Sequence, residues 1–184
     1  SRLKETNTES ELVELLLDFR LPQSIRPRTF VPSKSELSIM ELGEPEDWYM
    51  KLLPERMEIK RKVLERWLDE QEVTDIISET REMAKGISLD EGDLDSLLGI
   101  CSAAASNLSR YYEIKKMQKL ASRFYILSRQ LQYGVHADLA NSDLLELRFI
   151  KGDNSPSSRL SRNTARRLYE NGYESISDIV RKDI

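Results

Sequence analysis

The chain has 184 residues, 39% of them hydrophobic and 33% charged, with a formal net charge of −4. This balance is typical of a folded protein with one core or two small ones, and no apolar run approaches the roughly 20 residues of a membrane span. The single cysteine and single histidine exclude a disulfide framework, a cysteine metal site and a zinc site built from histidines. We therefore expect a cytoplasmic protein without a membrane partner.

The N-terminal region, residues 1–45, predicts one helix and an extended arm. Apolar residues recur at the spacing of one helix face between positions 9 and 19, at Leu12, Leu15, Leu16 and Phe19. Thr8 and Glu11 have the spacing of a capping box at the start of this helix. From residue 21 to 45, four prolines interrupt any periodic pattern, which favours an arm or linker.

Residues 46–137 predict a helical bundle with one long central helix. Helical spacing returns at Glu46, and Pro54 is expected to begin a new helix because proline fits the first helical turn. An apolar stripe follows at Ile59, Val63, Leu64, Trp67 and Leu68, and a shorter helix is expected from Val73 to about Lys85.

The long central helix is expected to begin at a second capping box, formed by Ser88 and Glu91. Helical spacing continues through almost five turns at Leu94, Leu97, Leu98, Cys101, Ala104, Ala105, Leu108, Tyr111 and Tyr112. The acids at 90–95 lack the ligand order of a calcium loop, so we interpret them as stabilising the helix N-terminus. A further helix buries Met117, Leu120, Ala121, Phe124, Leu127 and Leu131 and ends near Gly134, before a loop or cap at His136.

Residues 138–184 predict a small helix–hairpin–helix-like domain, which makes the expected fold class all-α. A short helix carries Leu144, Leu145 and Leu147, and a loop rich in Gly, Asn, Ser and Pro follows at 151–158. Helices are then expected at about 162–171 and from 175, with Ala165 small enough for close helix packing. Because the chain begins at Ser1 and its last residues keep a helical pattern, we expect it to be a piece of a longer protein.

Two basic surfaces are candidate nucleic-acid contacts. Residues 148–167 hold six basic residues against one acid, and a hairpin leading into a helix N-terminus offers backbone N–H groups to phosphate. The candidates there are Arg159, Ser161, Arg162, Thr164 and Arg166. Lys115, Lys119 and Arg123 form a second basic stripe, with Tyr111, Tyr112 or Tyr125 as stacking surfaces. The alternative for both is the solvated face of an amphipathic helix.

Four stretches occur in an order that resembles the C-terminal half of the HelQ-type superfamily-2 DNA helicases, including the archaeal Hjm group. They are VLERWLDE at 63–70, EGDL at 91–94, QYGV at 132–135, and ARRLYENGY followed by SISDI at 165–173 and 175–179. The resemblance covers about residues 60–184. It implies a ratchet-like bundle followed by a helix–hairpin–helix domain, both behind motor domains that are not evident in this chain.

The chain departs from that family at the expected DNA contacts. Where the family has a basic residue near the start of the long helix and an aromatic residue two turns later, this chain has Asp95, Ser96 and Ala103. The family's glycine-containing hairpin is replaced by residues 159–161 after an insertion at 152–158.

The resemblance implies an accessory region of a helicase that binds single-stranded or forked DNA through phosphates without reading sequence. It would act beside motor domains of the same protein, which would hold ATP and magnesium. We expect no catalytic residue, metal or cofactor in this chain itself. A protein-interaction or regulatory helical module that keeps the scaffold but lacks the DNA contacts remains the alternative.

Overall fold

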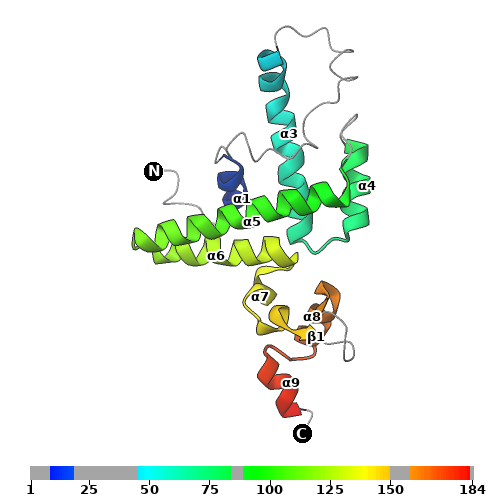
Figure 1. Ribbon diagram of the computed structural model, residues 1–184, viewed down its shortest axis with the longest axis vertical. Coiled ribbons are helices and arrows are strands. Elements are labelled where there is room, and N and C mark those ends of the chain that lie inside the picture. The colour runs from blue at the N-terminus through cyan, green and yellow to red at the C-terminus, as the bar shows by residue number, and fades with distance from the viewer. Residues whose placement is uncertain (1–8, 19–44, 84–88, 150–157, 183–184) are drawn as a thin grey trace.

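The computed structural model describes residues 9–18, 45–83, 89–149 and 158–182 (Figure 1). Within these residues the chain is helical apart from two short strands, which confirms the all-α prediction. The α-helices are α1 (Glu9–Asp18), α3 (Pro45–Leu68), α4 (Val73–Met83), α5 (Glu91–Ile114), α6 (Gln118–Tyr133), α7 (Ala137–Ala140), α8 (Arg162–Glu170) and α9 (Ile176–Lys182). A 3₁₀ helix, η4, covers Asp143–Glu146.

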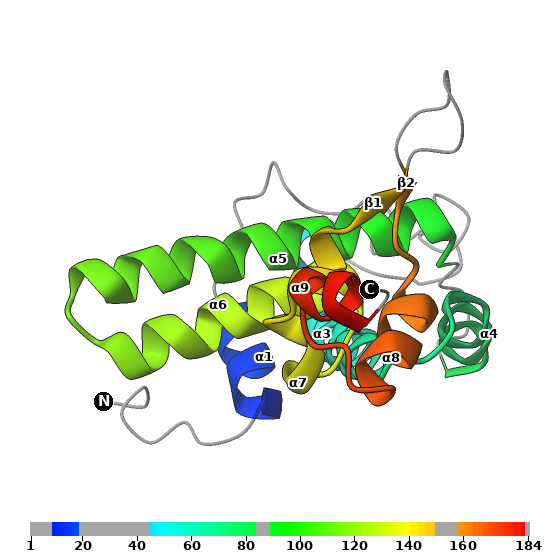
Figure 2. The same cartoon turned by 90° about the horizontal axis from the view of Figure 1, so that it is seen from below.

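The antiparallel pair α5 and α6 lies across the middle of the molecule, and its turn projects to one side (Figures 1 and 2). The helices α3 and α4 lie toward the opposite end of this pair. α1 packs on α3, α5 and α6, and the segment from α7 to α9 follows the end of α6. Two side-chain hydrogen bonds connect α5 to α6. The Ser102 hydroxyl donates to the Ser128 carbonyl at 2.9 Å, and the Ser109 hydroxyl donates to the Ala121 carbonyl at 2.8 Å.

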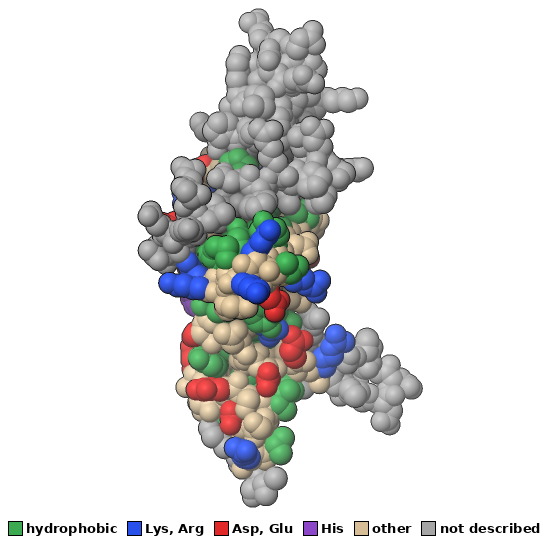
Figure 3. Space-filling view, turned by 90° about the vertical axis from the view of Figure 1, so that its left-hand side faces the viewer, with side chains coloured by type: hydrophobic (Ala, Val, Ile, Leu, Met, Phe, Trp, Pro, Cys, Tyr) green, Lys and Arg blue, Asp and Glu red, His purple; other side chains and the backbone are tan. Residues whose placement is uncertain are grey.

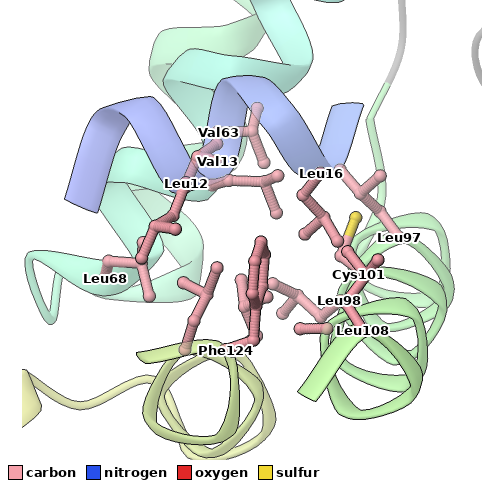
Figure 4. Close-up of a cluster of buried hydrophobic side chains, with 14 of the residues drawn as sticks. Leu12, Val13, Leu16, Val63, Leu68, Leu97, Leu98, Cys101, Leu108 and Phe124 are labelled. Atoms are coloured by element: carbon pink, nitrogen blue, oxygen red, sulfur yellow. The ribbon is translucent and has the colours of Figure 1, made fainter. Parts of the chain in front are cut away.

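The main core forms where α1, α3, α5 and α6 meet. Phe124 of α6 is fully buried beneath Leu12, Val13 and Leu16 of α1 (Figure 4). Cys101 lies in the same cluster with 1% of its surface exposed. These small and branched side chains fill the space between helices, which is the main source of stability in a bundle of this size.

A second apolar cluster lies in the C-terminal segment. Its buried members are Val135, Leu139, Ala140, Leu145, Leu160 and Ala165. Ile126 and Tyr133 of α6 pack against it, so this helix contributes to both clusters. The complete burial of Ala165 confirms the prediction of a close helix contact there.

The C-terminal segment also contains a strand pair that the sequence did not predict. β1 (Arg148–Phe149) pairs antiparallel with β2 (Ser158–Arg159), with Arg148 opposite Arg159. The pairing joins the two stretches that flank residues 150–157, which themselves lie outside the described residues. The backbone N–H of Leu160 then donates to the Leu147 carbonyl at 3.0 Å and directs the chain into α8.

Two predicted helix starts were wrong. α3 runs unbroken from Pro45 through Pro54, because an internal proline removes one rung of the hydrogen-bond ladder and leaves the other turns in place. α5 begins two residues later than the predicted box, at a reciprocal capping pair of Asp90 and Asp93. The predicted box at Thr8, the arm at 21–44 and Ser88 lie outside the described residues.

Two helices end at a left-handed residue that is not glycine. Lys116 has φ 57° after α5, and Glu70 has φ 60° after α3. After α5, the N–H of Lys116 donates to the Glu113 carbonyl and that of Met117 donates to the Tyr112 carbonyl, both at 2.9 Å. This is the Schellman pattern, in which glycine is the usual left-handed residue. A residue with a Cβ costs about 1 kcal/mol or more in this conformation.

Candidate nucleic-acid interface

Arg166 on α8 is held by two carboxylates from distant parts of the chain. Its Nε donates to Glu70 Oε2 at 3.0 Å, its Nη2 contacts the other oxygen of Glu70, and its Nη1 donates to Asp138 Oδ2 at 2.8 Å. The Arg166 side chain is only 17% exposed. The backbone N–H of His136 donates to Glu70 as well, at 2.8 Å. Arg166 therefore joins α8 to the α3–α4 turn and to α7.

The same contacts shift the pKa values of the three charged groups. Burial alone raises the pKa of Glu70, but the hydrogen bonds from Arg166 and from the His136 N–H outweigh burial and lower it overall. The Arg166 hydrogen bond lowers the pKa of Asp138. The two carboxylates in turn raise the pKa of Arg166. All three groups are therefore charged near neutral pH.

Arg162 makes a second link across the same junction. Its Nη2 donates to the Gln71 carbonyl at 2.9 Å, and its guanidinium lies over the Trp67 ring with 5.0 Å between their centres. The side chain is 12% exposed, and Glu72 Oε1 lies 3.7 Å from its Nη2. Trp67 is itself fixed by a 2.8 Å hydrogen bond from its indole N–H to the Leu131 carbonyl. Stacking on a fixed aromatic ring and bonding to a carbonyl leave little of this guanidinium for a phosphate.

The other candidates around the start of α8 are placed differently. Ser161 caps the helix, and its Oγ accepts the Thr164 N–H at 3.2 Å and contacts the Thr164 hydroxyl at 2.7 Å. Both residues are exposed, as is Arg167 on the outer side of the helix. Arg159 lies in β2, and its side chain lies outside the described residues. The structure thus brings Arg162 and Arg166 together at an internal junction and leaves Ser161 and Thr164 at the surface.

The second candidate surface lies where α5 turns into α6. Between positions 110 and 123 there are five basic residues and one acid, a net charge of +4. We call this surface the hairpin tip and define it as Arg110, Tyr111, Ile114, Lys115, Lys116, Lys119, Arg123 and Tyr125. Viewed from the end of the hairpin, basic and hydrophobic side chains lie side by side on it (Figure 3).

The tip lysines differ from the α8 arginines in their surroundings. Lys115, Lys116 and Lys119 are exposed, and none has a carboxylate within salt-bridge distance among the described residues. The Lys115 ammonium lies 5.6 Å from the centre of the Tyr111 ring. A cation resting on an exposed ring can turn to a phosphate without losing a buried ion pair.

The three tyrosines proposed as stacking surfaces are not equivalent. Tyr112 is 4% exposed and stacks on Phe124 with 5.6 Å between ring centres, so it belongs to the core. Tyr111 and Tyr125 are 51% and 50% exposed. Tyr111 and Tyr112 both continue the helical spacing of the stripe, but Tyr112 occupies the core position and Tyr111 lies at the surface. Tyr111 packs edge-on against the Tyr112 ring instead, which fixes it at the surface.

Sequence reasoning missed the most exposed apolar side chain described in the chain, Ile114, with 79% exposure. It also missed the role of Glu70, Gln71 and Glu72 in holding the α8 arginines. The only sign of this role in the sequence was the acidic composition of the turn after α3. The arginines that pair with this turn are more than 90 positions further along the chain.

Among the residues that the structure describes, no helix is long and apolar enough to cross a membrane. The same residues contain no cluster of His, Cys, Asp and Glu that could hold a metal ion. No family model, curated protein or solved structure matches this chain. The resemblance to HelQ-type helicases therefore stays a prediction.

Proposed function

We propose that this chain binds nucleic acid without sequence preference and that the hairpin tip makes the contact. The observation that carries the proposal is the combination of exposed lysines with two half-exposed tyrosines, on α5 and α6, at one helix–helix hairpin. Lysines neutralise phosphates, and aromatic rings stack on bases of any identity. Neither kind of contact reads sequence, so discrimination between sequences should be low.

The proposal moves the main contact away from the α8 arginines. Bringing a phosphate to Arg166 would leave Glu70 and Asp138 without their partner, and Glu70 is mostly buried. Removing one partner of such a buried pair is costly, whereas an exposed lysine exchanges only water and counterions for phosphate. Exposed Ser161 and Thr164 can add contacts at the edge of α8 without this cost.

The direct test is fluorescence anisotropy of a labelled single strand, a duplex and a fork, with the wild-type chain and with Lys115→Glu/Lys119→Glu. Both lysines are exposed, so the double variant should keep its helical circular dichroism. We expect its affinity to fall by about tenfold or more at low salt, since two phosphate contacts become repulsive. Affinity equal to that of the wild type would contradict the assignment.

Two further variants control for net charge and for the other basic surface. Arg81→Glu/Arg181→Glu changes the net charge equally at exposed positions away from the tip and should retain most of the affinity. Arg148→Glu/Arg167→Glu tests the exposed part of the C-terminal basic block. Arg162 and Arg166 are unsuitable for this purpose, because their reversal would also break the junction described above.

The resemblance to HelQ-type helicases supplies a context for this proposal. In that context the chain is a cytoplasmic accessory region that grips DNA beside a motor, and ATP and magnesium act at the motor domains. Steady-state phosphate release by this chain alone should be at background. Turnover that survives repurification would overturn this part of the proposal.

A protein-interaction module is the second candidate, and Ile114 is the observation that favours it. An isoleucine exposed in the middle of the tip contributes nothing to phosphate binding but could insert into an apolar pocket of a partner. Replacing Ile114 with Ser should leave nucleic-acid affinity almost unchanged. Absence of any nucleic-acid binding by the wild-type chain at low salt would favour this candidate.

A further inference from the structure

The charges of α5 are segregated along its length. Its start carries the acids Asp90, Glu91, Asp93 and Asp95 without a basic residue, whereas its end belongs to the basic hairpin tip. The 14 positions from 96 to 109 contain no charged residue at all. The helix therefore has an acidic end, a neutral middle and a basic end.

The acidic end is reinforced by the neighbouring helix. α4 and the turn before it, residues 69–83, contain six acids and one base, and α4 lies beside the start of α5 (Figures 1 and 2). Some of these acids are paired, since Glu79 bonds Arg66 and Glu70 bonds Arg166. Glu72, Asp75 and Glu82 remain exposed and keep the local potential negative.

The two ends are too far apart to cancel each other in solution. The 24 residues of α5 correspond to a helix about 36 Å long. This exceeds the screening length of about 8 Å at physiological salt several-fold. A polyanion is therefore attracted by the basic end of α5 when it lies at the hairpin tip, and it is repelled by the acidic end only when it extends that far.

The outer face between these ends offers a polyanion no charge to hold it. Asp95, Gly99, Ser106 and Arg110 fall within one side of the helix by its 100° rotation per residue. Gly99 is exposed, and apart from its chain neighbours and the adjacent backbone of α5 no described heavy atom lies within 4 Å of the position that a Cβ would occupy. The surface is open but neutral, and it ends at an exposed carboxylate.

From this charge pattern we propose that the nucleic acid is gripped only at the hairpin tip, over a short footprint, and does not run along α5. This inference rests on the proposed function and specifies its ligand. From Arg110 to its C-cap residue Lys115, α5 rises about 8 Å, and the neighbouring helix axis lies about 8–10 Å away. Such a surface accommodates on the order of four nucleotides, the lower limit for a single-strand site. A strand that continued along α5 would meet no basic residue and would approach the acids of Asp95 and α4, so the rest of the strand is expected to extend away from the bundle.

The test measures affinity against length for unlabelled oligothymidylates of 4, 6, 8, 12 and 20 nucleotides competing with a labelled 20-mer. For the wild-type chain, affinity corrected for the number of binding registers should reach its plateau by about 6 nucleotides. The salt dependence should correspond to no more than five neutralised phosphates, a slope of about −3.5 or shallower. Corrected affinity that keeps rising to 12 nucleotides or more would overturn the inference.

A variant with an added cation outside the hairpin tip provides a second test of the short footprint. Asp95→Lys replaces the repelling carboxylate with a cation about 22 Å along the helix from Arg110. We expect it to bind the 20-mer several-fold more tightly than the wild type and the 6-mer equally. Glu170→Lys, the same charge change at an exposed position on α8, should change neither affinity. Equal gains for both lengths would indicate a general charge effect and would count against the short footprint.

The outcomes separate this inference from the proposed function. If Lys115→Glu/Lys119→Glu binds every length as well as the wild type does, the tip assignment fails and the footprint fails with it. If that variant loses binding but the wild-type footprint is long, only the short-footprint inference fails.

Discussion

Gly134, which ends α6, lies at the closest contact between the bundle and the C-terminal segment. It adopts φ 65° and ψ 49°, and its N–H donates to the Gln130 carbonyl. A Cβ at this position would lie 2.6 Å from Trp67 Cζ2 and 2.9 Å from Arg162 Nη1. We therefore predict that Gly134→Ala is among the most destabilising single substitutions in the chain, although it adds only one methyl group.

The expected magnitude has two parts. A side chain in the left-handed region costs about 1–2 kcal/mol. The added methyl group must also displace a tryptophan that is held by its hydrogen bond to the Leu131 carbonyl, and overpacking of this kind costs about 1–3 kcal/mol. The sum is about 2–5 kcal/mol, which is a large part of the 5–15 kcal/mol stability of an ordinary domain.

Urea unfolding followed by circular dichroism and tryptophan fluorescence measures this change. With an m value of about 2 kcal/mol/M, the midpoint should fall by about 1–2.5 M. Gly99→Ala is the matched control, because Gly99 lies inside α5 with open space around it. That substitution should stabilise the chain by about 0.5–1 kcal/mol. A loss of less than 1 kcal/mol for Gly134→Ala would refute the reasoning.

Three other predictions follow from the described residues. The folded-state pKa values of Glu70 and Asp138 lie below their unfolded values of about 4.3 and 3.9. The stability that these carboxylates provide is therefore complete above about pH 5 and is lost as the pH falls through the folded-state values. Urea midpoints measured between pH 6 and 3 should show this loss, and the pH dependence should be smaller in Arg166→Gln. Lys116→Gly should raise the free energy of unfolding in urea by about 1 kcal/mol, because glycine adopts φ 57° without strain. The same variant should bind a single strand more weakly when binding is measured by anisotropy. A loss of stability would contradict the left-handed conformation of Lys116. Burial raises the pKa of Cys101 to about 12, so a disulfide reagent should modify this thiol slowly in the native chain and rapidly in urea, and fast native labelling would exclude a buried thiol.

Local patterns in the sequence were sufficient to predict most of the helices. The stripe from Leu94 to Leu108 and the apolar face of α6 follow the 3.6-residue period, and their burial was predicted almost position by position. Gly134 marked the end of α6 correctly because the left-handed stop is a property of glycine itself. Pro54 was misinterpreted because the cost of an internal proline is balanced by the rest of a 24-residue helix, which a local pattern does not include.

The candidate site was harder to predict because it depends on contacts between distant segments. Tyr111 and Tyr112 are adjacent and chemically identical, yet only one can face α6, and the position of Phe124 decides which. The exposure of Lys115 and Lys119 followed from the amphipathic pattern alone. For Arg162 and Arg166, the same pattern gave no indication that carboxylates and a tryptophan ring lay opposite them.

The two basic surfaces show why the net charge of a sequence stretch is a poor measure of its capacity to bind a polyanion. The block at 148–167 has the higher net charge by sequence, +5 against +4 for residues 110–123, but Arg162 and Arg166 are mostly buried at an internal junction. Apart from Asp138, their charged partners lie in the turn at 70–72, which is acidic for the same structural reason, since each charge is stable only while it neutralises the other. The hairpin tip has a lower net charge, but its lysines have no such partners among the described residues, so their attraction is available to a ligand. What determines binding is therefore the free energy needed to release a charge from its present contacts. By this criterion the order of the two surfaces is the reverse of the order that composition suggests.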